Sequence, residues 1–355
     1  MNSAAQNEML IEPDDLILVT GASGFIGKRV VQRLIDTGFR NVRCLVRPSS
    51  KSKLSGLLSI GNAGEVEIVR GNLLSREDCV AIARDAKAVI HLAAGRGEKS
   101  FPDAFMNSAV TTRNLLEACV QHGVCRRFVN VSSFAVYDNG HKATGRLLDE
   151  SCPLEAHPEV RGEAYCFAKT KQEQVVASFR DRFGLSVITL RPGVVYGPGN
   201  EKISGRVGIG TFGVFLHLGG SNPIPFTYVD NCAEAVVLAG LKAGVNGDVF
   251  NVVDDDVLSS REYLKLHKRN VRRFRSIYLP HSASYLLCYL WEKYSAWSEG
   301  QLPPIYGRGT WHAFWKKTRY SNQKLKHRLG WEPRVPTMEA LDRFFESCRK
   351  RSRHA

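Results

Sequence analysis

The chain has 355 residues, of which 43% are hydrophobic and 24% are charged, and this balance excludes a disordered or low-complexity protein. Its length predicts one large α/β domain with a smaller appended part. The formal net charge of +14 fits phosphorylated ligands, an anionic membrane surface or nucleic acid. Because no nucleic-acid motif accompanies the Lys and Arg clusters of the C-terminal half, we expect no nucleic-acid partner.

The N-terminal residues lack the basic start and apolar stretch of a secretory signal peptide, which predicts a cytoplasmic protein. The nine cysteines stand singly, without C-x-x-C spacing. This pattern predicts reduced thiols and no metal site.

Short apolar runs predict strands at residues 16–19, 42–46, 66–69, 88–92, 128–131 and 187–190. Helices are expected between them, beginning near Ser75, Asp103 and Ala164, and Ser75 with Asp78 suits a capping box. Alternating strands and helices imply a doubly wound parallel sheet in an α/β fold. We expect this dinucleotide-binding domain at 12–196, a mainly substrate-binding part at 197–347 whose elements return to the first domain, and a basic tail at 348–355.

Gly21, Gly24 and Gly27 follow the first predicted strand and open the first predicted helix. A helix N-terminus with open backbone N–H groups is suited to a dinucleotide pyrophosphate. A glycine triplet alone also fits a tight turn with no ligand. Its position inside a β-α-β unit favours dinucleotide binding.

The stretch that would supply a carboxylate to the ribose of NAD contains Arg47, and no acidic residue occurs between Asp36 and Glu65. Ser49, Ser50, Lys51 and Lys53 follow the arginine. A guanidinium pairs with phosphate through two parallel hydrogen bonds, so the sequence favours NADP over NAD, with an ordinary solvated basic loop as the alternative.

Tyr165 and Lys169 lie four residues apart in a predicted helix spanning 164–183, so their side chains share one face. Ser133 stands at the end of a predicted strand. A tyrosine with an ordinary pKa of about 10 needs a nearby cation to act as a base near neutral pH, and Lys169 is the expected cation. Ser133 would bind the substrate oxygen and Tyr165 would exchange a proton with it. The alternative is a helix-surface pair without chemistry.

The motifs TGASGFIG, HLAA at 91–94, VSSFAVY at 131–137, YCFAK at 165–169 and RPGVVYGPG at 191–199 resemble those of the extended short-chain dehydrogenase/reductases. The resemblance implies a Rossmann-type domain, an enzyme that acts on CH–OH groups, and catalysis by Ser133, Tyr165 and Lys169. Asn107 matches an asparagine on the helix behind the active site, for which a structural and a catalytic role are equally open.

The resemblance also implies which residues contact the cofactor. Tyr165 and Lys169 belong to this set, as do residues at the pyrophosphate, the ribose, the adenine and the nicotinamide: Gly21, Ser23, Gly24, Phe25, Ile26, Gly27, Arg47, Asn72, Leu73, Ala93, Ala94, Pro192, Gly193 and Val195. Asn72 stands where the family usually has an aspartate, so its hydrogen bond to adenine is in doubt.

Three functions remain open from the sequence. Val194 occupies a position where nucleotide-sugar enzymes usually have an asparagine, and residues 191–198 with the C-terminal portion look more like the 3β-hydroxysteroid dehydrogenase and dihydroflavonol reductase branch. We therefore expect oxidation or reduction of a hydrophobic, sterol-like alcohol or ketone. A nucleotide-sugar epimerase or dehydratase is the alternative, supported by the basic excess, and a non-enzymatic dinucleotide sensor is less favoured because Tyr165 and Lys169 are both present.

Residues 277–291 are apolar and aromatic but too short and interrupted to span a bilayer, and six Lys and Arg residues lie just before them. Peripheral contact with an anionic membrane is one reading. Packing of these aromatic residues inside the smaller part is the simpler one. A homodimer also remains open.

Overall fold

The computed structural model describes residues 9–48, 55–60, 64–95, 100–138, 140, 144–298, 301 and 306–354. Within these residues the centre is a seven-stranded parallel sheet in the order β12-β7-β5-β4-β1-β2-β3. Its strands are β1 (Ile17–Thr20), β2 (Val42–Val46), β3 (Val66–Arg70), β4 (Ala88–His91), β5 (Arg127–Val131), β7 (Val187–Pro192) and β12 (Val249–Val252). The predicted doubly wound sheet is confirmed, and each of the six strands expected from the sequence ends within two residues of its predicted limits.

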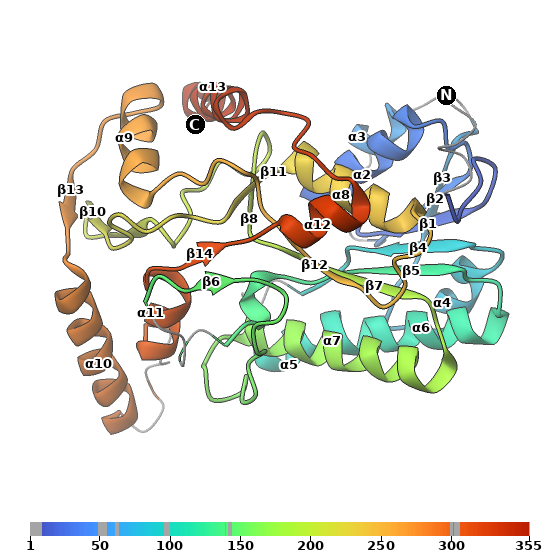
Figure 1. The fold of residues 1–355 in the computed structure, drawn as a ribbon, viewed down its shortest axis with the longest axis horizontal. Helices are drawn as coiled ribbons and strands as arrows, with labels where there is room; N and C mark the ends of the chain where they lie inside the picture. Colours follow the sequence, from blue (N-terminus) through green and yellow to red (C-terminus); the bar gives the residue numbers. More distant parts are fainter. Residues whose placement is uncertain are drawn as a thin grey trace.

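Helices cover both faces of this sheet (Figure 1). One face packs against α2 (Phe25–Asp36) and α8 (Val229–Leu241), and the other against α4 (Arg76–Ala83), α6 (Thr111–His122) and α7 (Ala164–Phe183). Within β1, Ile17 and Val19 belong to the first core and Leu18 to the second. Successive side chains of a strand point to opposite faces, so continuous apolar strands fill two cores at once.

The strand order reverses between β1 and β4, which pair with each other although β2 and β3 lie between them in the sequence. Chain connections leave the sheet in opposite directions at such a switch point and open a crevice beyond the carboxyl ends of the strands. The short helix α3 (Ser55–Leu58) lies on the β2–β3 connection. The sheet topology therefore marks the edge above β1 and β4 as the place for a ligand.

Most of the chain beyond residue 197 forms a second layer of elements beside one end of the sheet (Figure 1). Two strands that precede residue 197 join this layer, β6 (Leu147–Leu148) and β8 (Val194–Tyr196). The strands of this layer pair as β8 with β11 (Phe226–Tyr228), β10 (Val214–His217) with β9 (Gly208–Thr211) and β13 (Ser276–Tyr278), and β6 with β14 (Arg319–Tyr320). Its helices are α9 (Ser260–Asn270), α10 (His281–Trp297), α11 (Arg308–Phe314), α12 (Gln323–Leu329) and α13 (Thr337–His354). Three other elements belong to the main domain: β12 joins the main sheet by pairing with β7, and α8 and α12 pack against that sheet.

Three local details differ from the sequence-based expectation. The helix expected from Asp103 begins at α5 (Phe101–Phe105) and contains a π-helical turn at Met106–Val110 before α6. Ser75 caps α4 by accepting a hydrogen bond from the N–H of Asp78, but the reciprocal bond of a capping box is replaced, because the Asp78 carboxylate accepts from the N–H of Asn72. Helix α13 continues through residues 348–354, where a basic tail was expected.

None of the helices in the described part of the chain combines the length and the apolar composition needed to cross a membrane.

Candidate active site

The glycine turn after β1 is packed too closely for side chains. Gly21 has a φ of +69°, and a Cβ placed there would lie 2.9 Å from the backbone nitrogen of Ala93. A Cβ on Gly27 would lie 2.1 Å from the carbonyl oxygen of Gly21, and one on Gly24 would lie 3.0 Å from that same oxygen. Helix α2 begins directly after Gly24 with neither a side-chain cap nor an acidic residue in its first turn. The turn therefore presents backbone N–H groups and the positive end of the helix dipole to the crevice.

A cavity of about 390 Å³ lies above this turn, within the range of small-molecule sites. The carboxyl ends of β1, β2, β3, β4, β5 and β7 surround it. The structure brings every residue implied by the family resemblance to its wall: Gly21, Ser23, Gly24, Phe25, Ile26, Gly27, Arg47, Asn72, Leu73, Ala93, Ala94, Asn107, Ser133, Tyr165, Lys169, Pro192, Gly193 and Val195. The sequence analysis missed Leu45, Leu92, Gly95, Thr111, Val131 and Ser132, which also line it.

One end of the cavity carries Arg47, an exposed residue directly after β2. Asn72 stands beside it after β3, and its side-chain oxygen accepts a hydrogen bond from the N–H of Leu74 at 3.1 Å. The side-chain oxygen of Asn72 is therefore already engaged by the backbone of the turn that follows β3. The serine and lysine residues that follow Arg47 in the sequence, from Ser49 to Lys53, lie outside the described residues.

The other end of the cavity carries Ser133 and Tyr165. Ser133 follows β5, and its hydroxyl oxygen accepts a hydrogen bond from the N–H of Ala135 at 3.2 Å, which fixes the serine at the start of a short 3₁₀ helix. Burial raises the pKa of Tyr165 above its ordinary value, while a hydrogen bond with Ser133 acts in the opposite direction. Desolvation of the phenolate is the larger of these two causes, and the expected lowering by Lys169 stays a prediction.

Lys169 lies one turn after Tyr165 on α7 and is buried. Its ammonium donates to the carbonyl oxygen of Val131 at 2.7 Å and to Oε1 of Gln172 at 2.9 Å. Burial lowers the pKa of Lys169 to about 8, although the carboxylate of Glu173 acts against this shift. These two hydrogen bonds hold the lysine at the end of β5, and both of its acceptors are uncharged oxygen atoms.

A buried chain of hydrogen bonds continues from Gln172 to the glycine turn. Nε2 of Gln172 donates to the hydroxyl of Thr112 at 3.0 Å, and this hydroxyl donates to the carbonyl of Ser108 at 2.6 Å. His91 joins Thr112 at 2.8 Å through Nε2 and Thr20 at 2.8 Å through Nδ1. Because Thr112 has given its hydrogen to Ser108, Nε2 of His91 must be the protonated nitrogen and Nδ1 accepts from Thr20. This network links the end of β1 to Lys169.

His91 should make the stability of the protein depend on pH. Burial lowers its pKa to about 3, against about 6.5 in the unfolded chain. Between these two pH values, the histidine of the unfolded chain binds a proton that the folded one does not. The free energy of unfolding that His91 contributes is therefore fully present above about pH 6.5 and falls toward pH 3, by up to ~1.4 kcal/mol per pH unit. We expect His91→Asn to flatten this slope in urea unfolding measured across that window, whereas His157→Asn, at an exposed histidine, should leave it unchanged. Equal slopes in wild type and His91→Asn would contradict a neutral His91.

Removing the Lys169 ammonium should weaken both cofactor binding and turnover, because the group holds the strand end and stands one helical turn from Tyr165. We expect Lys169→Met to raise the dissociation constant of the cofactor and to lower kcat, in fluorescence titration and in steady-state assays. Lys171→Met removes the same charge two residues away and should do neither. Unchanged cofactor affinity in Lys169→Met would rule out a contact between the ammonium and the ribose.

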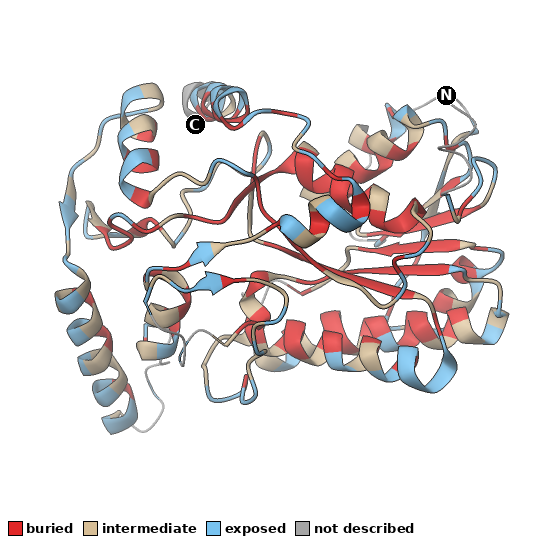
Figure 2. Cartoon of the chain, in the orientation of Figure 1, coloured by how far each residue is buried: buried red, intermediate tan, exposed pale blue. Residues whose placement is uncertain are grey.

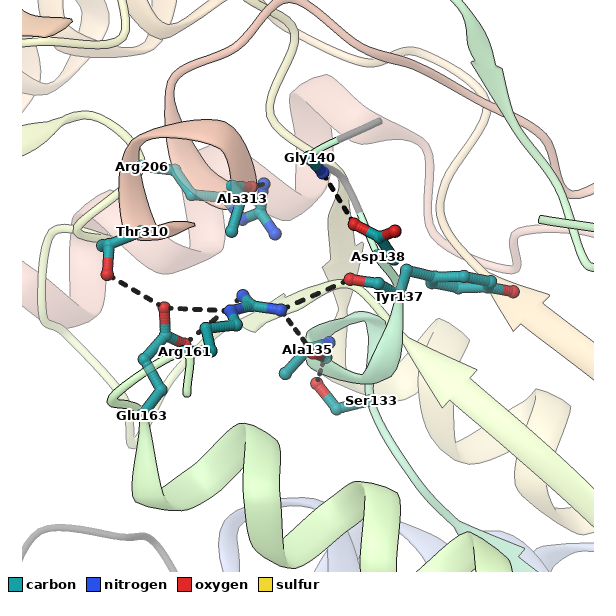
Figure 3. A network of polar contacts seen from close by, with 10 residues as sticks. All are labelled: Ser133, Ala135, Tyr137, Asp138, Gly140, Arg161, Glu163, Arg206, Thr310 and Ala313. Carbon is teal, nitrogen blue, oxygen red and sulfur yellow. Dashed lines mark hydrogen bonds and ion pairs between the residues drawn. The ribbon is translucent and has the colours of Figure 1, made fainter. Parts of the chain in front are cut away.

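A second polar network joins the start of α7 to the smaller part of the molecule (Figure 3). Glu163, two residues before Tyr165, accepts from Nε of Arg161 at 3.3 Å and from the hydroxyl of Thr310 on α11 at 3.1 Å. Arg161, whose side chain is 5% exposed, also donates to the carbonyl oxygen of Ala135 at 3.0 Å. The segments that carry Ser133 and Tyr165 are therefore tied to each other and to α11.

Residues 17–252 match the model of the NAD dependent epimerase/dehydratase family. Among curated proteins, the chain is 25% identical to 3beta-hydroxysteroid-dehydrogenase/decarboxylase isoform 1 of Arabidopsis thaliana, over 95% of the chain and 80% of that protein. It is 28% identical to the decarboxylating sterol-4-alpha-carboxylate 3-dehydrogenase of Saccharomyces cerevisiae, over 68% of the chain and 71% of that enzyme. Other relatives are longer, and the chain spans 36 to 43% of several of them.

Among solved structures, MoeE5 in complex with UDP-glucuronic acid and NAD superposes with a TM-score of 0.69 at 25% identity, over 95% of this chain and 99% of that one. The family match covers the sheet, the glycine turn and helix α7, and agrees with the motifs of the sequence. The chain therefore belongs to the NAD dependent epimerase/dehydratase family, within the extended short-chain dehydrogenase/reductases that its motifs resemble.

Proposed function

We propose that this protein interconverts a secondary alcohol and a ketone on a hydrophobic, sterol-like substrate, with NADP as the cofactor. The observation that carries the proposal is the single cavity wall on which the glycine turn, Ser133, Tyr165 and Lys169 all lie. The two curated relatives described above are both named as sterol or hydroxysteroid dehydrogenases, which supports the substrate class.

The residues present fit a nicotinamide dinucleotide. The turn carries no side chain at Gly21, Gly24 and Gly27, where a Cβ would meet neighbouring backbone atoms, so a pyrophosphate could approach its backbone N–H groups. The buried hydroxyl of Ser132 on the cavity wall has no hydrogen-bond partner among the described residues. When bound, such a cofactor supplies or accepts the hydride. Arg47 supports NADP over NAD, because its guanidinium can pair with a 2′-phosphate and no described carboxylate lines the cavity beside it.

In the reductive direction, Tyr165 gives its hydroxyl proton to the substrate oxygen while that oxygen accepts a hydrogen bond from Ser133. The charge left on the phenolate is stabilised by the ammonium of Lys169, one helical turn away. In the oxidative direction the same proton returns to Tyr165. The part of the chain after residue 197 would provide the wall that contacts the rest of the substrate.

The alternative is a nucleotide-sugar epimerase or dehydratase, which is favoured by the similarity to MoeE5, a protein whose structure holds UDP-glucuronic acid. Arg206 lies beside Ala313 in Figure 3, on the far side of Arg161 from Ser133, and could meet a diphosphate. Against this, Arg206 already donates to the carbonyl oxygen of Ala313 at 2.8 Å, and Val194 occupies the position where an asparagine is expected in such enzymes.

The substrate class can be tested by incubating the purified protein with NADPH and either hydrophobic ketones or nucleotide sugars. We expect net oxidation of NADPH with the sterol-like ketones and product alcohol in chromatographic analysis. Interconversion of a nucleotide sugar without net change in the cofactor would instead establish the alternative. Binding of cofactor without turnover of either class would indicate a dinucleotide sensor.

A further inference from the structure

Helix α10 lies on the surface of the molecule, yet it exposes large apolar side chains and buries small ones. The residues that it buries are Ser284, Cys288 and Ser295. Trp311 of α11 packs on this inner side, donating from Nε1 to the hydroxyl of Ser284 at 3.0 Å. A surface helix normally buries its large apolar side chains and exposes its small or polar ones.

The outward side of α10 carries four large apolar residues, while Tyr285 packs against Trp311 on the inner side. Leu286, Leu290, Tyr294 and Trp297 are 55%, 52%, 50% and 76% exposed. Their spacing of four, four and three residues places them on one face of the helix. Figure 2 shows α10 at the edge of the molecule, away from the main sheet, with exposed residues along its outer side.

The strand that precedes the helix also exposes apolar side chains. In β13, Ile277 is 55% exposed and Tyr278 is 43% exposed. We call these two residues together with Leu286, Leu290, Tyr294 and Trp297 the α10 surface. Exposed apolar patches of this kind mark interaction sites. The aromatic residue types in the α10 surface favour a membrane–water interface.

A basic cluster adjoins the α10 surface. Arg272, Arg273 and Arg275 are exposed on the connection from α9 to β13, and Lys265 and Arg269 are exposed on α9 itself. Figure 1 places α9, this connection, β13 and α10 along one edge of the molecule. Within the described chain, no carboxylate forms an ion pair with any of the three arginines of the connection. The partner of the α10 surface should therefore be apolar and carry negative charge beside the apolar part.

We propose that this edge of the protein docks on an anionic lipid bilayer, with the α10 surface among the outer acyl chains and the basic cluster at the headgroups. A bilayer supplies both complementary features side by side. A second copy of the chain would instead bring two basic clusters near each other. This proposal rests on the surface alone and does not depend on the proposed reaction.

Flotation of the full chain with phosphatidylcholine vesicles, with and without phosphatidylglycerol, tests this docking. At low salt we expect the protein to float with the anionic vesicles only, and high salt should weaken this binding. Arg272→Gln, Arg273→Gln and Arg275→Gln combined should lower the partition coefficient roughly a hundredfold, at about fivefold per contact.

Leu290→Glu with Trp297→Glu should lower the same coefficient on the order of tenfold or more, because two side chains lose their apolar environment. Leu58→Glu is the matched control, since Leu58 is 73% exposed on α3 at the opposite end of the molecule. All variants should keep wild-type circular dichroism and cofactor affinity, which separates this test from that of the reaction.

Absence of flotation with anionic vesicles at low salt would overturn the proposal. Equal binding by wild type and by Leu290→Glu with Trp297→Glu would also overturn it, because the basic cluster would then act alone. A dimer in sedimentation velocity that Leu290→Glu abolishes would show that a second copy covers the α10 surface.

Discussion

Replacing Tyr165 with Phe is expected to lower kcat by about a hundredfold to ten-thousandfold, the range attributed to a positioned acid or base. Only the hydroxyl that hydrogen-bonds with Ser133 is removed, so the ring still fills its place on the cavity wall. The dissociation constant of the cofactor should therefore stay close to that of wild type. Steady-state rates and cofactor titration on the same preparation separate the two effects.

Tyr196→Phe is a matched control for this variant. Tyr196 is buried in a separate core, in the smaller part of the molecule, against Phe226 and Tyr228, and its hydroxyl has no hydrogen-bond partner in the described part of the chain. Loss of that hydroxyl should leave turnover unchanged and should not destabilise the fold. Full activity in Tyr165→Phe would remove the tyrosine from the mechanism.

Arg47→Asp is expected to weaken NADP binding by about 2–3 kcal/mol, or roughly 30-fold to 150-fold, and to leave or improve NAD binding. The guanidinium lies at the cavity wall directly after β2, where a carboxylate would instead accept hydrogen bonds from ribose hydroxyls. Titration of both cofactors against wild type and variant measures the switch.

Arg40→Asp makes the same charge change at the opposite end of β2 and should alter neither affinity. If wild type binds NAD more tightly than NADP, Arg47 is a surface charge and the cofactor preference proposed here is wrong. A general effect of net charge would instead appear equally in both variants.

The fold could be predicted from the sequence because its strands are buried on both faces and read as continuous apolar runs. Residues 16–19 are of this kind, and all of them except Leu16 lie inside β1. The π-helical turn at Met106–Val110 could not be foreseen, since an extra residue in a helix leaves no clear change in apolar spacing. Likewise, the outward apolar face of α10 follows from how the helix packs and cannot be read from its composition.

The cavity wall was predictable where motifs specify backbone geometry, as at Gly21 and Gly193, where a side chain would meet neighbouring backbone atoms. The polar networks could not be predicted, because the residues that they join are far apart in the sequence. Gln172 stands three residues after Lys169 and could have been suspected from helical spacing, whereas Arg161 meets Ala135 only through the tertiary fold. The raised pKa of Tyr165 also depends on burial that no local pattern records.

The most direct test of the proposed reaction follows an isotopic label from the cofactor. Wild-type protein is given NADPH with deuterium at the hydride-bearing carbon of the nicotinamide, together with a sterol-like ketone, and the product is analysed by mass spectrometry. We predict one deuterium on the carbinol carbon of the product for each cofactor oxidised, and loss of this transfer in Tyr165→Phe. Recovery of all deuterium on the cofactor, with the ketone unchanged, would contradict the account.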